Sequence, residues 1–401
     1  NFIKKVEKNT GNELSSIIPF IGFILGVRYE DDRLNDREEI QNHINISIRT
    51  LLESICLITN SKNKPYIFIL EDLHWIDKMS MDLLIFITST FDFKSKKEDK
   101  NTSYPLFICT FRKTYSLPDE LIKEIDYTQL NLEALNKKHS IELISVLTKD
   151  LGINKNKEKE LLEKSKGNPF FIEEWVSLIN DPKTFTENLE ESQGVKEYVI
   201  PSTINALILA RIDALDKSLK SLLQKATIIG QDFFLQILSE LEKKLGLSDN
   251  IKTPVDSLEK ENFIQHFINQ LDHYKFKHIL TRDVAYSTIL KSNKRILHKS
   301  VAEVIEENFQ DKLEVFYSDL AIHYYTSENY DKAMNFFNLA ANKAFFIFDY
   351  KQAADCYNEI ISIIQKDKKY KSSIEKINQE DNSDKDNKII RYYIKAKIGL
   401  S

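Results

Sequence analysis

The sequence contains little glycine, proline or cysteine. Nine glycines and eight prolines in 401 residues disfavour β-sandwiches and propellers, which need many tight turns, and indicate long helices. The three cysteines, Cys56, Cys109 and Cys356, lie far apart, and no histidine or second cysteine stands at metal-ligand spacing from them. We therefore expect neither a disulfide framework nor a structural zinc site, and we expect a reducing compartment, the cytoplasm.

A long apolar run and an excess of one charge are also missing. The longest apolar stretch, residues 17–27, contains Pro19 and is too short to span a bilayer. Lys and Arg number 56 and Asp and Glu 61, a net charge of −5, which argues against a protein that binds nucleic acid mainly through charge. The length allows about two or three domains. Because the first residue is Asn1 rather than methionine, we expect a piece of a longer protein.

The first third of the chain alternates helix and strand signals. Residues 40–58 place Ile and Leu at helical spacing, and residues 66–70 (YIFIL) are a short apolar run typical of a strand buried on both faces. A helix is predicted to begin after Asp77, whose side chain can cap it. Residues 105–112 (PLFICTFR) predict a second buried strand. This order indicates an α/β sheet with crossover helices.

Beyond residue 119 strand signals become scarce, and most of the remaining sequence predicts helices. The predictions, in chain order, are amphipathic helices over 133–150 and 157–180, a polar linker over 181–199, short helices ending in a strand-like segment over 200–292, an almost wholly helical region over 295–364, and a flexible charged segment over 366–388.

The first predicted strand ends in two consecutive carboxylates, Glu71 and Asp72. Desolvating a carboxylate is costly unless a cation or hydrogen-bond donors compensate. In α/β sheets the carboxyl ends of strands open into the ligand crevice, where one carboxylate can hold Mg²⁺ and its neighbour can orient or deprotonate a water. The alternative is that both residues simply begin a solvated turn.

Two other segments bear on this choice. Arg112 follows the second predicted strand, where a guanidinium can reach the same crevice and contact a terminal phosphate, although alone it is an ordinary surface cation. Gly167-Asn168-Pro169 is a turn before a helix that carries Glu173 and Glu174 in its first two turns. Proline and acidic residues suit a helix start, so this turn has a purely structural explanation too. Together the two strand ends favour a nucleotide site.

Six segments, in order, resemble the STAND class of AAA-like P-loop ATPases, in the form fused to class III adenylyl or guanylyl cyclases, to LuxR-type regulators and to some kinases. They look like that family's Walker B segment, sensor strand, Gly-x-Pro turn, start of the winged helix, closing segment and tetratricopeptide-type (TPR-like) helices. The segments are EDLHWID (71–77), TFR (110–112), GNPFFIEE (167–174), residues 200–233, residues 276–306 and LAIHYYTSENYDKAMNFF (320–337).

The resemblance implies roles for individual residues and implies ATP and Mg²⁺ as ligands. Glu71 matches the family's Mg²⁺-associated acid and Asp72 its water-activating acid. The family more often has Asp at the first position, so we expect slow or absent hydrolysis. Arg112 matches the γ-phosphate sensor, and Gly167 and Pro169 match the turn whose proline packs near the adenine; the sequence leaves guanine open as well.

His278 has two interpretations. Related switches place a histidine against the bound phosphates near this position, but a packed histidine at a strand end is the plainer explanation, and we favour it.

The architecture that the resemblance implies is the C-terminal part of an α/β P-loop NTPase core, followed by an all-α lid, a winged-helix-like domain and TPR-like helices. The expected boundaries are 1–118 for the core, 119–199 for the lid and linker, 200–292 for the winged-helix-like domain, 293–365 for the TPR-like helices, and 366–401 for a flexible segment and terminal helix.

No GxxxxGK[ST] motif occurs in the sequence, although phosphates need such a glycine-rich loop at a helix N-terminus. Either the loop lies before Asn1 or the module is degenerate and binds nucleotide poorly. We favour the first, because the family's loop lies further before the Walker B strand than this chain extends. In both cases the chain alone is expected to hydrolyse ATP poorly.

These features predict an ATP-binding regulatory module of a larger cytoplasmic signalling protein, with a soluble-type adenylyl or guanylyl cyclase as the expected output. The alternative is a degenerate, non-catalytic scaffold whose TPR-like helices bind protein partners. We expect no nucleic acid partner, because residues 200–292 are nearly neutral, with 12 Lys and Arg against 11 Asp and Glu.

The prediction of TPR-like helices is based on two similar turns, at 329–333 and 349–353, each of which leads into an Ala-bearing helix. Their spacing of 20 residues is shorter than the usual repeat of about 34, so plain helical packing is an equal alternative. Six aromatic residues of this region are expected in the core: Tyr324, Tyr325, Phe336, Phe337, Phe345 and Phe346.

Overall fold

The computed structural model of the chain forms two compact units. The first comprises Asn1–Asn131 and Ala341–Cys356, and the second Leu132–Ala340 and Tyr357–Ser401. Of the flexible segment and terminal helix expected over 366–401, only Lys366, the last residue of the final described helix, and Asp367 are described. The structure describes residues 16–24, 39–60, 66–90, 105–125, 127–149, 153, 155–179, 189–192, 195–198, 200–247, 250–267, 272–347 and 349–367.

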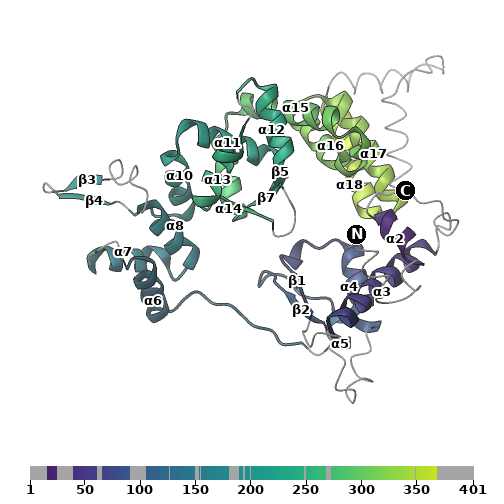
Figure 1. The fold of residues 1–401 in the computed structure, drawn as a ribbon, viewed down its shortest axis with the longest axis horizontal. Coiled ribbons are helices and arrows are strands. Elements are labelled where there is room, and N and C mark those ends of the chain that lie inside the picture. The colour runs from purple at the N-terminus through teal and green to yellow at the C-terminus, as the bar shows by residue number, and fades with distance from the viewer. Residues whose placement is uncertain are drawn as a thin grey trace. The chain divides into compact units, whose positions relative to one another are not determined.

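Helices and two parallel strands make up the first unit (Figure 1). Strands β1 and β2 pair in parallel from Ile67↔Leu106 to Leu70↔Cys109, as the apolar runs predicted. Asp77 caps the following helix as expected, because its carboxylate accepts hydrogen bonds from the Ser80 backbone N–H at 2.9 Å and hydroxyl at 2.6 Å. The elements are α2 (Ile18–Ile24), α3 (Ile40–Asn60), β1 (Ile67–Leu70), η3 (Leu73–Trp75), α4 (Lys78–Thr90), β2 (Leu106–Cys109) and α5 (Asp119–Glu124).

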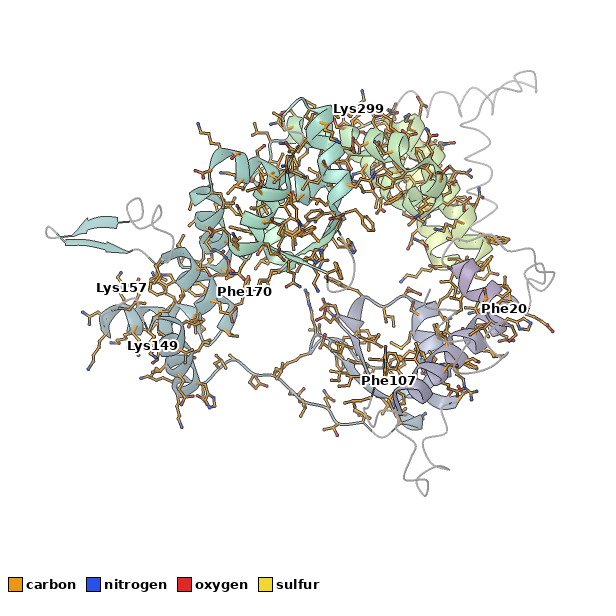
Figure 2. All side chains as sticks on the ribbon, in the orientation of Figure 1. Phe20, Phe107, Lys149, Lys157, Phe170 and Lys299 are labelled. Carbon is orange, nitrogen blue, oxygen red and sulfur yellow. The ribbon has the colours of Figure 1, made fainter. Side chains whose placement is uncertain are left out.

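The two strands are covered on one face. Leu70, Phe107 and Cys109 pack on a cluster that includes Met81 of α4 and Leu121 of α5; Phe107 is labelled in Figure 2. The side chains of the opposite face are 42–62% exposed: Ile67, Ile69, Leu106 and Ile108. The prediction of strands buried on both faces is therefore wrong in the described part of the chain, because its helices pack on one face only.

The second unit begins with a small helical layer. Helices α6 (Lys137–Leu147), α7 (Lys155–Ser165) and α8 (Pro169–Ile179) enclose a core that includes Leu161, Ile172 and Trp175. Residues 181–199, expected to be a linker, contain the antiparallel hairpin of β3 (Leu189–Ser192) and β4 (Val195–Tyr198).

A three-stranded antiparallel sheet with surrounding helices follows. The strand order is β5-β7-β6, and the core between sheet and helices includes Leu223, Leu238, Phe233 and Tyr274. The elements are α10 (Ile204–Ala214), α11 (Lys217–Ile229), β5 (Asp232–Phe234), α12 (Leu235–Lys244), α13 (Lys252–Lys260), β6 (Ile264–His266), β7 (His273–Phe276) and α14 (Ile279–Ser287).

The helical prediction for residues 295–364 is confirmed. Helix α15 packs on α11, α12 and α16. Asn329 and Asp349 cap α17 and α18, and the expected small residues Ala333 and Ala353 are buried. The elements are α15 (Lys291–Asn308), η4 (Gln310–Phe316), α16 (Tyr317–Thr326), α17 (Tyr330–Phe346) and α18 (Tyr350–Lys366).

The six aromatic residues of this region differ in burial. Tyr324, Phe336 and Phe337 are buried as expected, and Tyr325 is half-buried. Phe345 and Phe346, in contrast, are about half exposed, so their assignment to the core was wrong. Among the helices of the described residues, none combines the length and apolarity needed to cross a bilayer.

Candidate functional site

The parallel pairing brings the two predicted strand ends together. Leu70 lies opposite Cys109 in the register, so the residues after both strands emerge at one edge of the pair. Glu71 and Asp72 follow β1, and Arg112 stands three residues beyond β2. These three of the five predicted site residues therefore share this edge.

Thr110 holds in place the turn formed by residues 71–75, which we call the acidic turn. Its backbone N–H donates to the Leu70 carbonyl at 3.0 Å, its hydroxyl accepts from the Asp72 N–H at 3.1 Å, and its carbonyl accepts from the Leu73 N–H at 2.8 Å. No role for Thr110 was predicted from the sequence. The available signal was a hydroxyl residue directly after a strand expected to neighbour the acidic one.

Asp72 has a left-handed backbone, with φ of 54°, which few residues other than glycine adopt. The turn continues into η3, where the Trp75 N–H donates to the Asp72 carbonyl at 2.9 Å. Glu71 and Asp72 are both exposed. Exposed carboxylates fit a solvated turn and a surface cation site alike, so the cation site is favoured only by their position beside Thr110 and Arg112.

Arg112 is an exposed side chain whose guanidinium carbon lies 5.9 Å from the centre of the Trp75 ring. This is within cation–π range and restricts the guanidinium to the neighbourhood of the acidic turn. Trp75, 55% exposed, is a second residue of this edge for which the sequence predicted no role.

The acidic turn suits Mg²⁺ only together with other ligands. Among the described residues, no three His, Cys, Asp or Glu side chains form a metal-binding group. Mg²⁺ bound to a nucleotide takes one or two carboxylates, with phosphate oxygens and waters as its remaining ligands. Glu71 and Asp72 have the donor chemistry for that share of the ligands.

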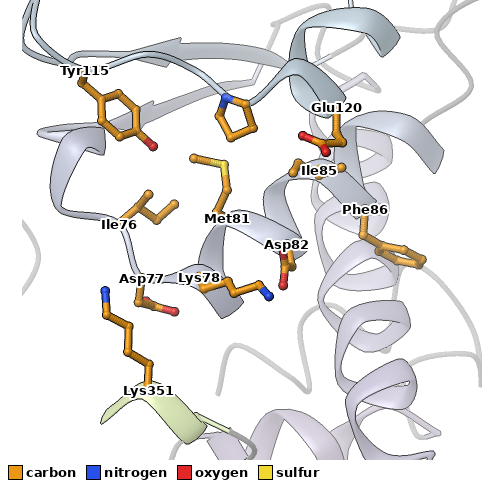
Figure 3. Close-up of a pocket in the computed structure, with 11 residues that line it drawn as sticks. Ile76, Asp77, Lys78, Met81, Asp82, Ile85, Phe86, Tyr115, Glu120 and Lys351 are labelled. Carbon is orange, nitrogen blue, oxygen red and sulfur yellow. The ribbon is translucent and has the colours of Figure 1, made fainter. Parts of the chain in front are cut away.

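A hollow of about 670 Å³ lies on the first unit, beside the start of α4. Figure 3 shows Asp77, Asp82 and Glu120 among its lining side chains. Burial raises the pKa of Asp77, but the hydrogen bonds from Ser80 outweigh this effect, so the pKa is lowered. Asp77 therefore serves as a helix cap, and none of the predicted site residues lines the hollow.

The other two predicted residues, Gly167 and Pro169, share one turn of the second unit. Gly167 has φ of +76°, and its carbonyl accepts from the Leu135 N–H at 2.8 Å. The Asn168 side chain accepts from the Phe170 N–H at 3.0 Å, and Pro169 is the first residue of α8. Asn168 and Pro169 thus start the helix as a cap and a first-turn proline do.

Helix α8 is joined to the sheet-containing part of the unit by a buried ion pair. Glu174 of α8 bonds Arg211 of α10, and both are about 5% exposed. Arg211 also donates a hydrogen bond to the Glu261 carbonyl. Its guanidinium carbon lies 4.6 Å from the centre of the Phe263 ring. Burial raises the pKa of Glu174 more than Arg211 lowers it. Glu174 was expected to interact favourably with the helix dipole near the start of α8. In the structure it pairs with an arginine 37 residues away.

His278 reinforces this joint. Its ring lies 4.0 Å from that of Phe170 in α8, which Figure 2 labels. Burial lowers the pKa of His278, and Lys277 lowers it further. These contacts agree with the packed histidine that we favoured.

Comparisons with known proteins give distant similarities. No family model matches the chain. Uncharacterized protein R02095 of Rhizobium meliloti (strain 1021) is 23% identical over 312 residues, which are 73% of this chain and 27% of that protein. The chain therefore spans about a quarter of that relative's length.

A solved structure is similar over the whole chain. It is the Signal Transduction ATPase with Numerous Domains (STAND) protein with a tetratricopeptide repeat sensor from Pyrococcus horikoshii, of which 60% is covered, at 15% identity and a TM-score of 0.42. A TM-score this low does not establish a common fold.

Proposed function

We propose that the chain is the ATP-binding regulatory module of a larger signalling protein of the STAND class of P-loop ATPases. The observation that carries the proposal is the parallel, in-register pair β1–β2. This pair puts an acidic strand end, Glu71-Asp72, beside a strand end that carries Thr110 and Arg112. Acidic and basic groups at the carboxyl ends of neighbouring parallel strands suit nucleotide phosphates and their Mg²⁺.

Each residue of this edge has a task in the proposed site. Glu71 would hold Mg²⁺ through its carboxylate, and Asp72 would orient a water for attack. Arg112 would contact the terminal phosphate through its planar guanidinium. The assignment of Gly167 and Pro169 to a turn next to the base stays a prediction from the resemblance.

The second unit would transmit the nucleotide state. The order helix, strand, helix, helix, strand, strand from α11 to β7, with an antiparallel sheet, supports a winged-helix-like domain. The ion pair of Glu174 with Arg211 joins the turn-bearing helix α8 to this domain. Helices α15–α18 would be the TPR-like region, and the output would be a soluble-type adenylyl or guanylyl cyclase whose activity the module biases.

The test replaces Asp72 with Asn in the full-length protein and measures MgATP binding, turnover and output. We expect Asp72→Asn to bind ATP at least as tightly as the unmodified protein but to lose turnover by about 10²-fold or more, because water activation is removed. The matched control is Asp82→Asn, since Asp82 is an exposed acid of α4. Unchanged turnover and output in Asp72→Asn would contradict the proposal.

A non-catalytic scaffold is the second candidate, favoured by the lack of a GxxxxGK[ST] motif in the sequence. Its TPR-like helices would bind protein partners, and nucleotide would have no effect on the output. Sequencing the transcript upstream of Asn1 separates the two candidates. A GxxxxGK[ST] motif there supports the ATPase module, and intact upstream sequence without one supports the scaffold.

A further inference from the structure

The acidic turn contains a buried imidazole that has no hydrogen-bond partner among the described residues. His74 lies in η3, and only 9% of its side chain is exposed. Within the part of the chain that the structure describes, neither of its ring nitrogens has a hydrogen-bond partner. Buried polar groups in native proteins are nearly always paired, so an unpaired one needs an explanation.

An acceptor lies just out of reach. The Asp72 carboxylate oxygen Oδ1 is 4.0 Å from His74 Nδ1, too far for a hydrogen bond. The Asp72 side chain is 59% exposed, so little packing opposes its rotation, whereas Thr110 fixes the backbone on both sides of it. A shift of the carboxylate by about 1 Å would bring the pair to an N–H···O distance.

We propose that His74 is a positioning residue for Asp72, whose carboxylate accepts a hydrogen bond from the Nδ1–H of His74. The ring would then carry a proton on Nδ1, the nitrogen that faces the carboxylate. The bond selects one orientation of an otherwise exposed carboxylate beside Arg112. This inference rests on the proposed function, because the orientation of Asp72 matters for turnover only in a nucleotide site.

A ring that only fills space would give the same burial. The His74 ring lies 5.0 Å from the Trp75 ring, a contact that phenylalanine can also make. Three variants separate the roles. His74→Asn keeps an N–H donor near the position of Nδ1, His74→Gln places its amide nearer to Nε2, and His74→Phe fills the volume without a donor.

The first experiment needs no nucleotide. Long-range ¹H–¹⁵N NMR of the protein at neutral pH reports which ring nitrogen carries the proton. We expect the Nδ1–H form for His74 and its loss in Asp72→Gly, a change that removes the carboxylate and suits the φ of 54°. The other seven of the eight histidines are internal controls. An Nε2–H form, or a signal that Asp72→Gly leaves unchanged, would overturn the inference.

The second experiment measures MgATP turnover in the full-length protein. We expect kcat to fall about tenfold or more in His74→Gln and His74→Phe, with KM unchanged, and to be largely kept in His74→Asn. Thermal unfolding identifies a variant that fails to fold. If His74→Phe does, the comparison of His74→Gln with His74→Asn decides. A wild-type kcat in a folded His74→Gln would also overturn the inference.

The two proposals fail in different ways. An unmodified protein that neither binds nor turns over MgATP contradicts the proposed function. The NMR result then still decides whether His74 donates to Asp72.

Discussion

Gly167 has a backbone conformation and a surrounding space that admit only glycine without strain. Its φ is +76°, and a Cβ added there would lie 2.2 Å from the Leu135 carbonyl oxygen. The Gly167 carbonyl accepts a hydrogen bond from the Leu135 N–H. The turn before α8 is therefore determined by backbone contacts, in addition to the proline that follows.

At this residue we predict that Gly167→Ala destabilises the second unit by about 1–3 kcal/mol, because strain and a clash act together. Urea denaturation followed by circular dichroism measures the loss. The matched control is Gly246→Ala, which has φ of +68° but nothing within 4 Å of an added Cβ, so it has the conformational cost alone. Equal losses in the two variants would contradict the clash.

At the scale of the element, a buried charge pair joins α8 to α10 in addition to apolar packing. Glu174 and Arg211 come from helices α8 and α10, and Arg211 also bonds the carbonyl of Glu261 before β6. A buried ion pair adds little net stability compared with apolar side chains of similar volume. Replacing only one of the two charged residues is costly, because the other charge stays buried without its partner.

We therefore predict that Arg211→Met lowers the free energy of unfolding by about 3–5 kcal/mol. The double variant Glu174→Met/Arg211→Met is expected to recover most of this loss, since neither charge of the pair is then left buried. Urea denaturation of the unmodified protein, both single variants and the double variant gives the coupling energy. A double variant no more stable than Arg211→Met alone would refute the explanation.

At the scale of the whole molecule, a chain of polar rings, a half-buried tyrosine and two buried histidines, joins the sheet-containing part of the second unit to its helical region. The Tyr286 hydroxyl in α14 lies 3.0 Å from His298 Nε2 in α15, and His298 Nδ1 lies 2.8 Å from His323 Nδ1 in α16. Burial lowers the pKa of His298 to about 4, helped by Arg282 and Lys294. Burial and His298 lower that of His323 to about 3.

Both pKa values are below that of an unfolded histidine, about 6.5. The unfolded chain therefore binds more protons below pH 6.5, and stability present above that pH is lost as pH falls toward the folded pKa values. We predict a loss of at most about 1.4 kcal/mol per pH unit for each histidine, steepest near pH 5, where the unfolded histidine is protonated and the folded one is not. His323→Asn should remove the contribution of one histidine from the pH dependence of the free energy of unfolding, so the slope should be shallower. Denaturation midpoints at several pH values test this, and an unchanged slope would refute it.

The order of the elements could be predicted from the sequence because its signals are local. The apolar run that forms β1, the cap at Asp77 and the helical spacing of α3 each lie within a few residues of one another. The parallel order of β1 and β2 follows from the helix between them. The edge shared by Glu71, Asp72 and Arg112 was foreseen for the same reason.

Only the tertiary structure decided which distant groups meet. Thr110 bonds the turn 38 residues before it, Glu174 finds its arginine 37 residues later, and His298 meets His323 across two helices. The exposure of Ile67 and Ile69 likewise depends on where helices pack. An apolar run or a carboxylate shows what kind of environment it needs, but its partner is chosen by the packing of segments that are far apart in the chain.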